Sequence, residues 1–159
     1  MKIILEGADG TGKTTLANIL AEKYGLNVCH CTQHDPSDFY FYKETFRKEN
    51  TVWDRHTIGE LIYPQVFGRD PQISKVEAQV LIELAKEADV KILVLTCDDK
   101  VLKKRLAERE DEHHLITKSI EWINKSFCDA AKIMNVPLID TSKMTLQEIF
   151  DIIEEKGKH

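Results

Sequence analysis

The sequence predicts an α/β fold in three layers, with a five-stranded parallel sheet covered by helices on both faces. Two observations support this prediction. Short segments at residues 3–5, 26–31, 51–54, 92–95 and 136–139 have the length and composition of strands. They alternate with longer segments in which apolar residues recur at helical spacing. A chain that alternates in this way folds as parallel strands joined by helices that cover both faces of the sheet.

Capping sequences and apolar stripes place several helices. Ser74-x-x-Glu77 and Thr145-x-x-Glu148 have the spacing of a capping box, which begins a helix. A short helix from residue 59 is expected to end near Pro64, because proline interrupts the helical hydrogen-bond pattern. Helical spacing also predicts two buried faces, formed by Val76, Val80, Leu81 and Leu84 in one helix and by Trp122, Ile123, Phe127 and Ala130 in a long helix over 116–134.

Length and composition limit the class of protein. A chain of 159 residues is expected to form one domain, over residues 1–159, and to bury about 70% of its unfolded surface. Its net charge of −5, with acids and bases interspersed, disfavours nucleic acid as a partner. No apolar run approaches the ~20 residues of a membrane span, and residues 1–20 do not have the pattern of a signal peptide. Four cysteines without disulfide spacing favour a reducing compartment, so we expect a cytoplasmic protein.

A glycine-rich motif joins the first expected strand to the first helix. It fits the phosphate-binding pattern G-x-x-x-x-G-K-[ST] and reads Gly7-Ala8-Asp9-Gly10-Thr11-Gly12-Lys13-Thr14, followed by Thr15. Unpaired N–H groups and the positive end of the helix dipole can hold phosphate oxygens there. In this pattern Lys13 reaches the β- and γ-phosphates and the Thr14 hydroxyl binds Mg²⁺. The sequence therefore predicts that residues 7–15 bind a nucleoside triphosphate.

The third expected strand ends in a carboxylate that should face the same loop. Asp54 stands at its carboxyl end, where open α/β sheets bind ligands and where phosphate-loop proteins hold Mg²⁺. Arg55 follows, and a guanidinium there can bind a phosphate through two parallel hydrogen bonds. Arg69, in the turn over residues 68–71, is a further candidate for substrate binding. A structural ion pair is the alternative interpretation of Asp54 and Arg55.

Aromatic residues gather in the helix expected after residue 37. Phe39, Tyr42 and Phe46 have the spacing of a core-facing stripe, whereas Tyr40 and Phe41 fall on other faces. Aromatic side chains outside the core need another contact. Stacking on a nucleobase is one such contact, and packing against a neighbouring helix is the alternative.

Two arginines border the apolar stripe of the helix that Asp98 is expected to cap. At 100° per residue, Arg105 and Arg109 project within about 60° of Leu102. The polar segment that follows, residues 110–114, is expected to be mobile. Arginines at the base of such a segment can close over a bound phosphate, so we place a lid at about residues 105–116. An ordinary charged helix is the alternative.

Cys29, His30, Cys31 and His34 form a dense group of side chains that can bind metals. Strand alternation places Cys29 and Cys31 on one face and His30 on the other, and the spacing differs from that of known zinc sites. We therefore expect strand residues here and no zinc.

Several motifs resemble one family. Residues 6–15 closely resemble the phosphate loop of thymidylate kinases and their deoxynucleoside kinase relatives. Asp54-Arg55-His56, with Tyr63 downstream, resembles the Asp-Arg-aromatic motif of that family, although His56 replaces the usual aromatic residue. The run from Arg105 to Arg109 resembles the family's lid. The chain is most similar to the short, phage-type deoxynucleoside monophosphate kinases, and their phosphate-loop kinase fold is the one that this resemblance implies.

The resemblance also implies roles for individual residues. Asp9 would approach the sugar of the acceptor, Arg55 its phosphate, and Tyr63 the sugar face that separates deoxyribose from ribose. His34 stands before Asp35-Pro36, where the family often carries an arginine, and we count it among the substrate-binding candidates.

Arginines of the lid would balance the negative charge of the transition state. Some members of the family carry an arginine in the phosphate loop, but Gly10 occupies that place here. Arg105 and Arg109 would then have to supply the positive charge.

We therefore expect a kinase that moves the γ-phosphoryl group of ATP to a deoxynucleoside monophosphate, dTMP or a related pyrimidine. Lys13, Asp54, Arg55 and the two lid arginines would be catalytic, and the Mg²⁺ cofactor would be held by Thr14 and Asp54.

Three other functions are open to such a chain. A deoxynucleoside kinase would need Asp54 as the base for a 5′-hydroxyl. A GTPase switch is disfavoured because the N-K-x-D motif is missing, since Asn124-Lys125 is followed by Ser126-Phe127. A non-catalytic nucleotide sensor would not require lid arginines. The sequence also leaves open whether the chain is a monomer or a homodimer.

Overall fold

The computed structural model describes residues 1–32, 35–109 and 114–155. Within them the chain forms one sheet of five strands, all parallel, in the order β2-β3-β1-β4-β5. The strands are β1 (Lys2–Gly7), β2 (Asn27–His30), β3 (Thr51–Asp54), β4 (Val90–Thr96) and β5 (Leu138–Asp140). β3 has the expected range, and the other four strands differ from the expected ranges at their ends, the part of an element that sequence predicts least well.

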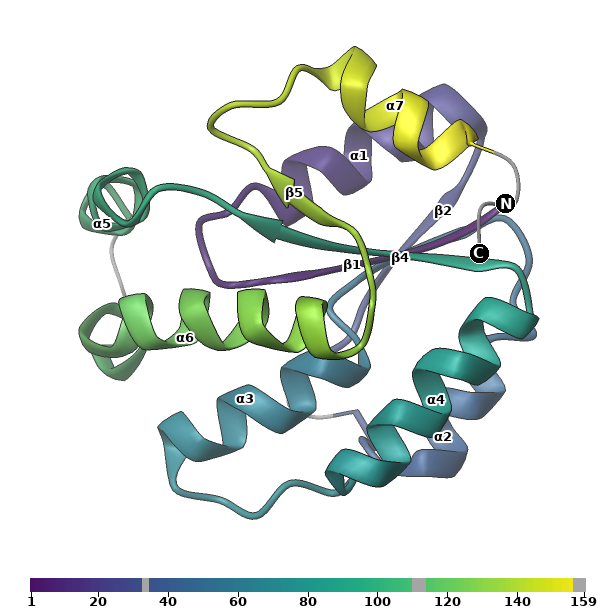
Figure 1. Cartoon of the computed structure of the whole chain (residues 1–159), viewed down its shortest axis with the longest axis horizontal. Helices are drawn as coiled ribbons and strands as arrows, with labels where there is room; N and C mark the ends of the chain where they lie inside the picture. Colours follow the sequence, from purple (N-terminus) through teal and green to yellow (C-terminus); the bar gives the residue numbers. More distant parts are fainter. Residues whose placement is uncertain (33–34, 110–113, 156–159) are drawn as a thin grey trace.

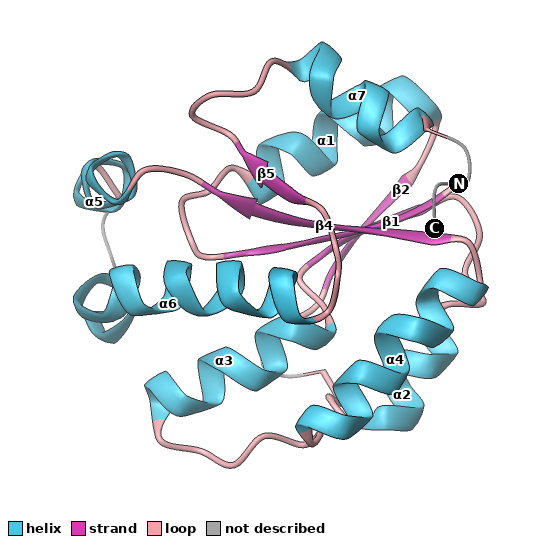
Figure 2. Ribbon diagram, in the orientation of Figure 1, coloured by secondary structure: helices cyan, strands magenta, loops and turns pink. Residues whose placement is uncertain are grey.

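Helices cover both faces of this sheet, as Figures 1 and 2 show. The helices of the described residues are α1 (Lys13–Tyr24), α2 (Phe39–Thr45), α3 (Thr57–Phe67), α4 (Lys75–Glu87), α5 (Asp99–Ala107), α6 (His114–Ile133) and α7 (Leu146–Glu154). In the view of Figure 1, α1 and α7 lie above the sheet and α2, α3, α4 and α6 lie below it. The predicted three-layer α/β fold is confirmed.

The alternation of side chains along β1 explains the two layers. Ile3 and Leu5 pack with residues of α1 and α7, and Ile4 packs with residues of α2, α3, α4 and α6. All three side chains are buried, as expected for the central strand of a sheet that is covered on both faces. Because every strand is parallel, their carboxyl ends meet at one edge, and the loops that follow the strands gather there.

The expected end of a helix at Pro64 is wrong. α3 continues to Phe67, and the backbone N–H groups of Gly68 and Arg69 both donate to the Pro64 carbonyl. Gly68 ends the helix because its φ of 68° suits glycine. Proline removes only its own hydrogen bond, and the buried Ile62 and Tyr63 hold this turn against the core.

Two predicted buried faces are also partly wrong. Val76 is 73% exposed and Val80 is 43% exposed, and α4 packs instead through Ala78, Leu81, Ile82 and Ala85. Trp122 is 45% exposed, and α6 is buried along Ile116, Ile120, Ile123, Asn124, Phe127 and Ala131. Each helix carries more than one apolar stripe, and only packing on the sheet decides which stripe is buried.

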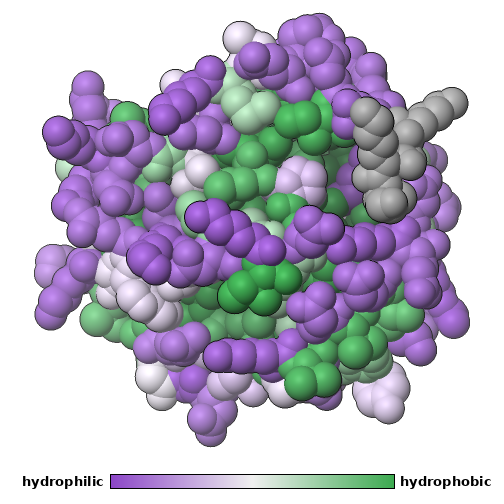
Figure 3. All heavy atoms as spheres, in the orientation of Figure 1, coloured by the Kyte–Doolittle hydropathy of each residue, from purple (hydrophilic) through white to green (hydrophobic). Residues whose placement is uncertain are grey.

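The capping boxes are confirmed at both predicted positions. The Ser74 hydroxyl accepts from the Glu77 backbone N–H, and the Glu77 carboxylate accepts from the Ser74 backbone N–H. Thr145 and Glu148 form the same reciprocal pair of hydrogen bonds. No helix in the described part of the chain is long and apolar enough to cross a membrane. Hydrophilic side chains cover most of the face seen in Figure 3, with hydrophobic ones in the gaps between them.

Candidate active site

The phosphate loop leaves the carboxyl end of the central strand and begins α1. Gly7 has a φ of 142°, and a Cβ placed there would lie 2.4 Å from the Leu95 carbonyl oxygen of the neighbouring strand. Only glycine fits this close approach. Gly12 has a φ of 96° and precedes the first residue of α1, so its conformation turns the chain into the helix.

Lys13 folds back on the loop. Its Nζ donates to the Ala8 carbonyl at 2.8 Å, and the Thr11 hydroxyl donates to the same oxygen at 2.7 Å. The Lys13 side chain is buried, and this burial lowers the pKa of its ammonium group to about 8. A buried cation that faces a cavity gains most from an anionic ligand, because little water screens the interaction.

Asp54 faces the same loop from the end of β3. Its Oδ2 accepts from the Thr14 hydroxyl at 2.7 Å and lies 3.1 Å from His30 Nδ1. A hydroxyl and one carboxylate, completed by substrate phosphates, are ligands typical of Mg²⁺. The structure thus brings together the two residues predicted to hold the metal. It also adds His30, which sequence reasoning treated only as a strand residue.

Cys29 and His30 lie on β2, and Cys31 follows the end of that strand. In the described part of the chain, no three side chains of His, Cys, Asp or Glu come together in a way that could hold a metal ion. Cys29 and Cys31 are free thiols, each half-buried. His34 lies outside the described residues.

Asp9, Arg55 and Tyr63 form a cluster beside the loop. The Arg55 guanidinium and the Tyr63 hydroxyl both donate to Asp9 Oδ1, the latter at 2.9 Å. The guanidinium carbon lies 5.2 Å from the centre of the Tyr63 ring, within the range of a cation–π contact. Burial raises the pKa of Tyr63, so its hydroxyl stays a donor. The residues that the resemblance assigned to the acceptor's sugar and phosphate are therefore adjacent.

Glu6 positions this cluster, and sequence reasoning did not identify it. Its carboxylate is buried at the end of β1 and accepts from the backbone N–H groups of Ile58 at 2.6 Å and Gly59 at 3.3 Å. These N–H groups belong to the first turn of α3, which has no partner for them within the helix. Burial raises the pKa of Glu6 to about 7. Glu6 therefore ties the start of α3, and with it the segment that carries Arg55, to the central strand.

His56 behaves as an aromatic core residue. It is buried, its ring centre lies 4.7 Å from that of Tyr42, and it stacks on Phe46 at 5.6 Å. Its ring nitrogens bond the hydroxyls of Thr45 and Thr57. Burial lowers the pKa of His56 to about 3, so the ring is neutral at pH 7. This explains how a histidine can occupy the position at which the family pattern has an aromatic residue.

A cavity of about 450 Å³ opens between these groups. Its walls include Lys13, Thr14 and Asp54 from the phosphate-loop side, and Arg55, Tyr63, Arg69 and Arg109 from the others. Such a volume is within the range of small-molecule sites. Tyr40 and Phe41 are not among the residues that line it. Tyr40 is 75% exposed, Phe41 packs against the core, and Tyr42 reaches the cavity instead.

Arg69 lines the cavity and forms an ion pair with Glu60. Its guanidinium forms two parallel hydrogen bonds to the buried Glu60 carboxylate, at 2.8 and 3.0 Å, and the Gln72 backbone N–H also donates to Glu60. Both terminal nitrogens of Arg69 bond Glu60, whereas Arg55 bonds Asp9 through Nη2, so Arg69 is the weaker candidate for a phosphate.

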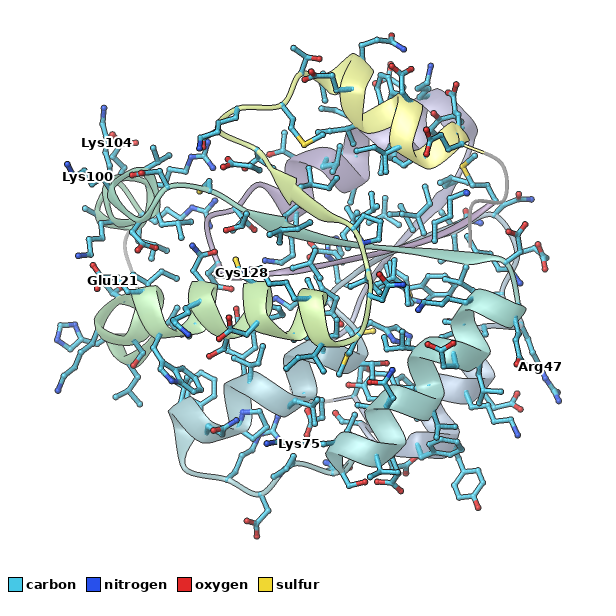
Figure 4. All side chains as sticks on the ribbon, viewed as in Figure 1. Arg47, Lys75, Lys100, Lys104, Glu121 and Cys128 are labelled. Carbon is cyan, nitrogen blue, oxygen red and sulfur yellow. The ribbon has the colours of Figure 1, made fainter. Side chains whose placement is uncertain are left out.

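The two lid arginines have different positions. Arg109 lines the cavity, whereas Arg105 does not. Arg105 Nη1 donates to the Gly10 carbonyl of the phosphate loop at 2.7 Å and lies 3.8 Å from Cys97 Sγ. Lys100 and Lys104, on the same helix, are exposed and point away from the protein (Figure 4). The remainder of the predicted lid includes residues 110–113, which lie outside the described residues.

Comparisons with known proteins agree with the fold. A family model described as an AAA domain matches residues 3–126. The chain is 27% identical over 177 residues to cytidylate kinase 2 of Borreliella afzelii, covering 98% of this chain and 96% of that protein. Among solved structures, it resembles the YorR protein of Bacillus subtilis in complex with phosphorylated GDP, with a TM-score of 0.80, 24% identity and coverage of 96% and 94%. It also resembles a deoxyadenosine kinase from M. mycoides with bound dATP, with a TM-score of 0.64, 18% identity and coverage of 98% and 100%. These two structural similarities support the fold.

Proposed function

The chain belongs to the AAA domain family, and we propose that it is a kinase that transfers the γ-phosphoryl group of MgATP to a nucleoside monophosphate. One observation carries this proposal. A single cavity is lined by the phosphate-loop groups Lys13 and Thr14 and, on another wall, by the Arg55 cluster. It therefore offers cationic groups for two phosphates, one from each substrate, as transfer between two nucleotides requires.

The donor end of the cavity has the parts that phosphoryl transfer needs. Backbone N–H groups at the start of α1 would hold the β-phosphate, and Lys13 would bind the β- and γ-phosphates. Thr14 and Asp54 would hold Mg²⁺, which when bound neutralises charge between the phosphates. Neither residue would need to form a covalent bond to the transferred group.

At the acceptor end, Arg55 would bind the monophosphate. Asp9 uses only part of the guanidinium's five N–H donors, so others remain for phosphate oxygens. An acceptor phosphate oxygen would then attack the γ-phosphorus, and the bond to the β-phosphate oxygen would break to release ADP. Arg109 would balance the charge that spreads over the transferred group.

For the acceptor we propose dTMP or a related pyrimidine deoxynucleotide. The thymidylate kinase-like motifs around Asp9 and Arg55 support this assignment, and so does the name of the relative called cytidylate kinase 2. Tyr63, whose hydroxyl bonds Asp9, would lie against the sugar and disfavour ribose.

The test is ADP release from MgATP with a panel of acceptors at matched concentration. The panel contains dTMP, dCMP, CMP, AMP, thymidine and deoxycytidine. We expect the fastest turnover with a pyrimidine monophosphate. Faster turnover of thymidine or deoxycytidine would overturn the monophosphate assignment and make Asp54 the candidate base for a 5′-hydroxyl. ATP binding without turnover of any acceptor would contradict a kinase and favour a sensor.

A further inference from the structure

We propose that Asn124, on α6, is a positioning residue for the phosphate loop, and that it acts through Cys97 and Arg105 on Gly10. The inference rests on the proposed function, because it assigns Asn124 an effect on the ATP site. Sequence reasoning considered Asn124 only as part of a missing GTPase motif.

The Asn124 amide is buried and fully bonded. Its Oδ1 accepts from the Thr96 hydroxyl at 2.8 Å, and its Nδ2 donates to the Cys97 carbonyl at 3.1 Å and to Asp99 Oδ1 at 3.2 Å. Only 7% of the residue is exposed. A buried amide that satisfies both of its N–H donors and its carbonyl specifies one arrangement of the groups around it. Asn124 therefore fixes the end of β4 and the first turn of α5 relative to α6.

Arg105 carries this arrangement to the phosphate loop. Cys97, whose carbonyl Asn124 holds, has its sulfur 3.8 Å from Arg105 Nη1. The same nitrogen donates to the Gly10 carbonyl at 2.7 Å. Arg105 is also on α5, whose first turn Asn124 anchors through Asp99. Two connections thus link Asn124 to the same guanidinium.

The Gly10 peptide needs such an external contact. Gly10 has a φ of 86° and no side chain of its own to bond the loop. Its neighbour Thr11 is held similarly, because the Thr141 hydroxyl donates to the Thr11 carbonyl at 2.8 Å. Hydrogen bonds from outside therefore orient two successive carbonyls of the phosphate loop. The direction of each carbonyl determines the direction of the next N–H group, and these N–H groups bind phosphate.

A second connection between α5 and α6 provides a matched control. Lys103 forms an ion pair with Glu121, and both side chains are more than half exposed. Figure 4 shows Glu121 on α6, together with Cys128. This pair joins the same two helices but contacts neither Cys97 nor Arg105 in any described bond. Exposed pairs contribute little to stability, so Glu121→Ala should leave the loop unchanged.

The experiment measures binding of a non-hydrolysable ATP analogue with Mg²⁺ by calorimetry, with no acceptor present. We expect Asn124→Leu to weaken binding by about 5–20-fold, the loss that follows from one or two hydrogen bonds. Arg105→Ala should weaken binding to a similar extent. In the Arg105→Ala background, Asn124→Leu should change binding by less than about twofold, because the two residues act in series. Glu121→Ala should bind as the wild type does.

Asp99→Ala serves if Asn124→Leu does not fold, because Asp99 is exposed and its loss removes one bond of the amide. It should weaken binding by about 2–5-fold, and only when Arg105 is present. Equal effects of Asn124→Leu or Asp99→Ala with and without Arg105 would overturn the inference. Wild-type affinity in both single variants would overturn it too. If the wild type bound no ATP analogue, the proposed function itself would fail, so the two failures are distinguishable.

Discussion

Arg55 donates to the Asp9 carboxylate from a backbone conformation that is rare for a residue with a side chain. Its φ is 73°, in the left-handed region, which costs of order 1–3 kcal/mol. The Arg55 N–H donates to the Leu5 carbonyl at 2.9 Å, and the next turn is held by Glu6. Contacts with the central strand on either side thus keep Arg55 in this conformation. As a result the guanidinium lies beside the phosphate loop.

Arg55→Ala should weaken use of the acceptor monophosphate by roughly 10–150-fold in kcat/KM, because a hydrogen bond to a charged group contributes about 1.5–3 kcal/mol. Arg55→Lys should recover only part of the loss, since an ammonium cannot form the planar pair of bonds. Steady-state kinetics with varied acceptor measures both. Arg47→Ala is the control, because Arg47 is exposed and forms an ion pair with the exposed Glu44. An Arg55→Ala variant as efficient as the wild type would contradict the role.

Arg109→Ala should lower kcat far more than it raises either KM. Arg109 lines the cavity, and an arginine that balances transition-state charge contributes about 10³–10⁵ in rate in related transfers. Arg105→Ala should instead raise mainly the KM for ATP, since Arg105 contacts the phosphate loop. Parallel measurement of kcat and both KM values separates the two arginines. A kcat within about threefold of wild type for Arg109→Ala would remove it from the mechanism.

Loss of the Lys13 proton should lower kcat/KM for MgATP at alkaline pH. Burial lowers the pKa of Lys13 to about 8 in the free protein, so the ammonium that binds phosphate is lost as the pH rises through that value. We expect kcat/KM for MgATP to fall about tenfold per pH unit above 8. Lys13→Arg should have lower activity, but its kcat/KM should not fall in this pH range, because the guanidinium stays charged. Lys13→Met should abolish transfer, with Lys23→Met, on the same helix, as the control. A flat wild-type profile between pH 7 and 10 would be the contrary result.

Glu6 should make stability depend on pH. The ordinary pKa of a glutamate, 4.5, applies to the unfolded chain. Burial disfavours the carboxylate and raises the pKa of Glu6 to about 7 in the folded protein. Below 4.5 both states hold the proton, and between 4.5 and 7 only the folded state holds it. The free energy of unfolding should therefore fall across this window as the pH rises, by about 3 kcal/mol.

The comparison for Glu6 is with Glu6→Gln, which cannot titrate. Urea unfolding of both proteins from pH 4.5 to 8 isolates the contribution of this carboxyl. We expect the wild type to lose stability relative to the variant as the pH rises. If the two profiles ran parallel, Glu6 would keep an ordinary pKa despite its burial.

The architecture and the phosphate-loop half of the candidate site could be predicted from the sequence. Alternating strand and helix segments require a parallel sheet covered on both faces, and the phosphate loop is a local motif whose residues are contiguous. The meeting of Thr14 with Asp54 was also predictable, because the carboxyl ends of parallel strands share one edge.

Which candidate side chains face the cavity could not be predicted, because it depends on packing between elements that are distant in the chain. Tyr40, Phe41 and Tyr42 are consecutive in the sequence, but α2 packs so that Tyr42 alone of the three lines the cavity. Arg105 and Arg109 were expected on one helix, but α5 ends at Ala107. Arg109 therefore lies beyond the helix and lines the cavity, whereas Arg105 contacts the phosphate loop. For α2, helical periodicity defines the possible stripes of side chains, whereas the choice among them depends on the surface against which the helix packs. The contacts of Glu6 and Asn124 were not predicted for a related reason, since their partners are backbone groups and side chains distant in the chain.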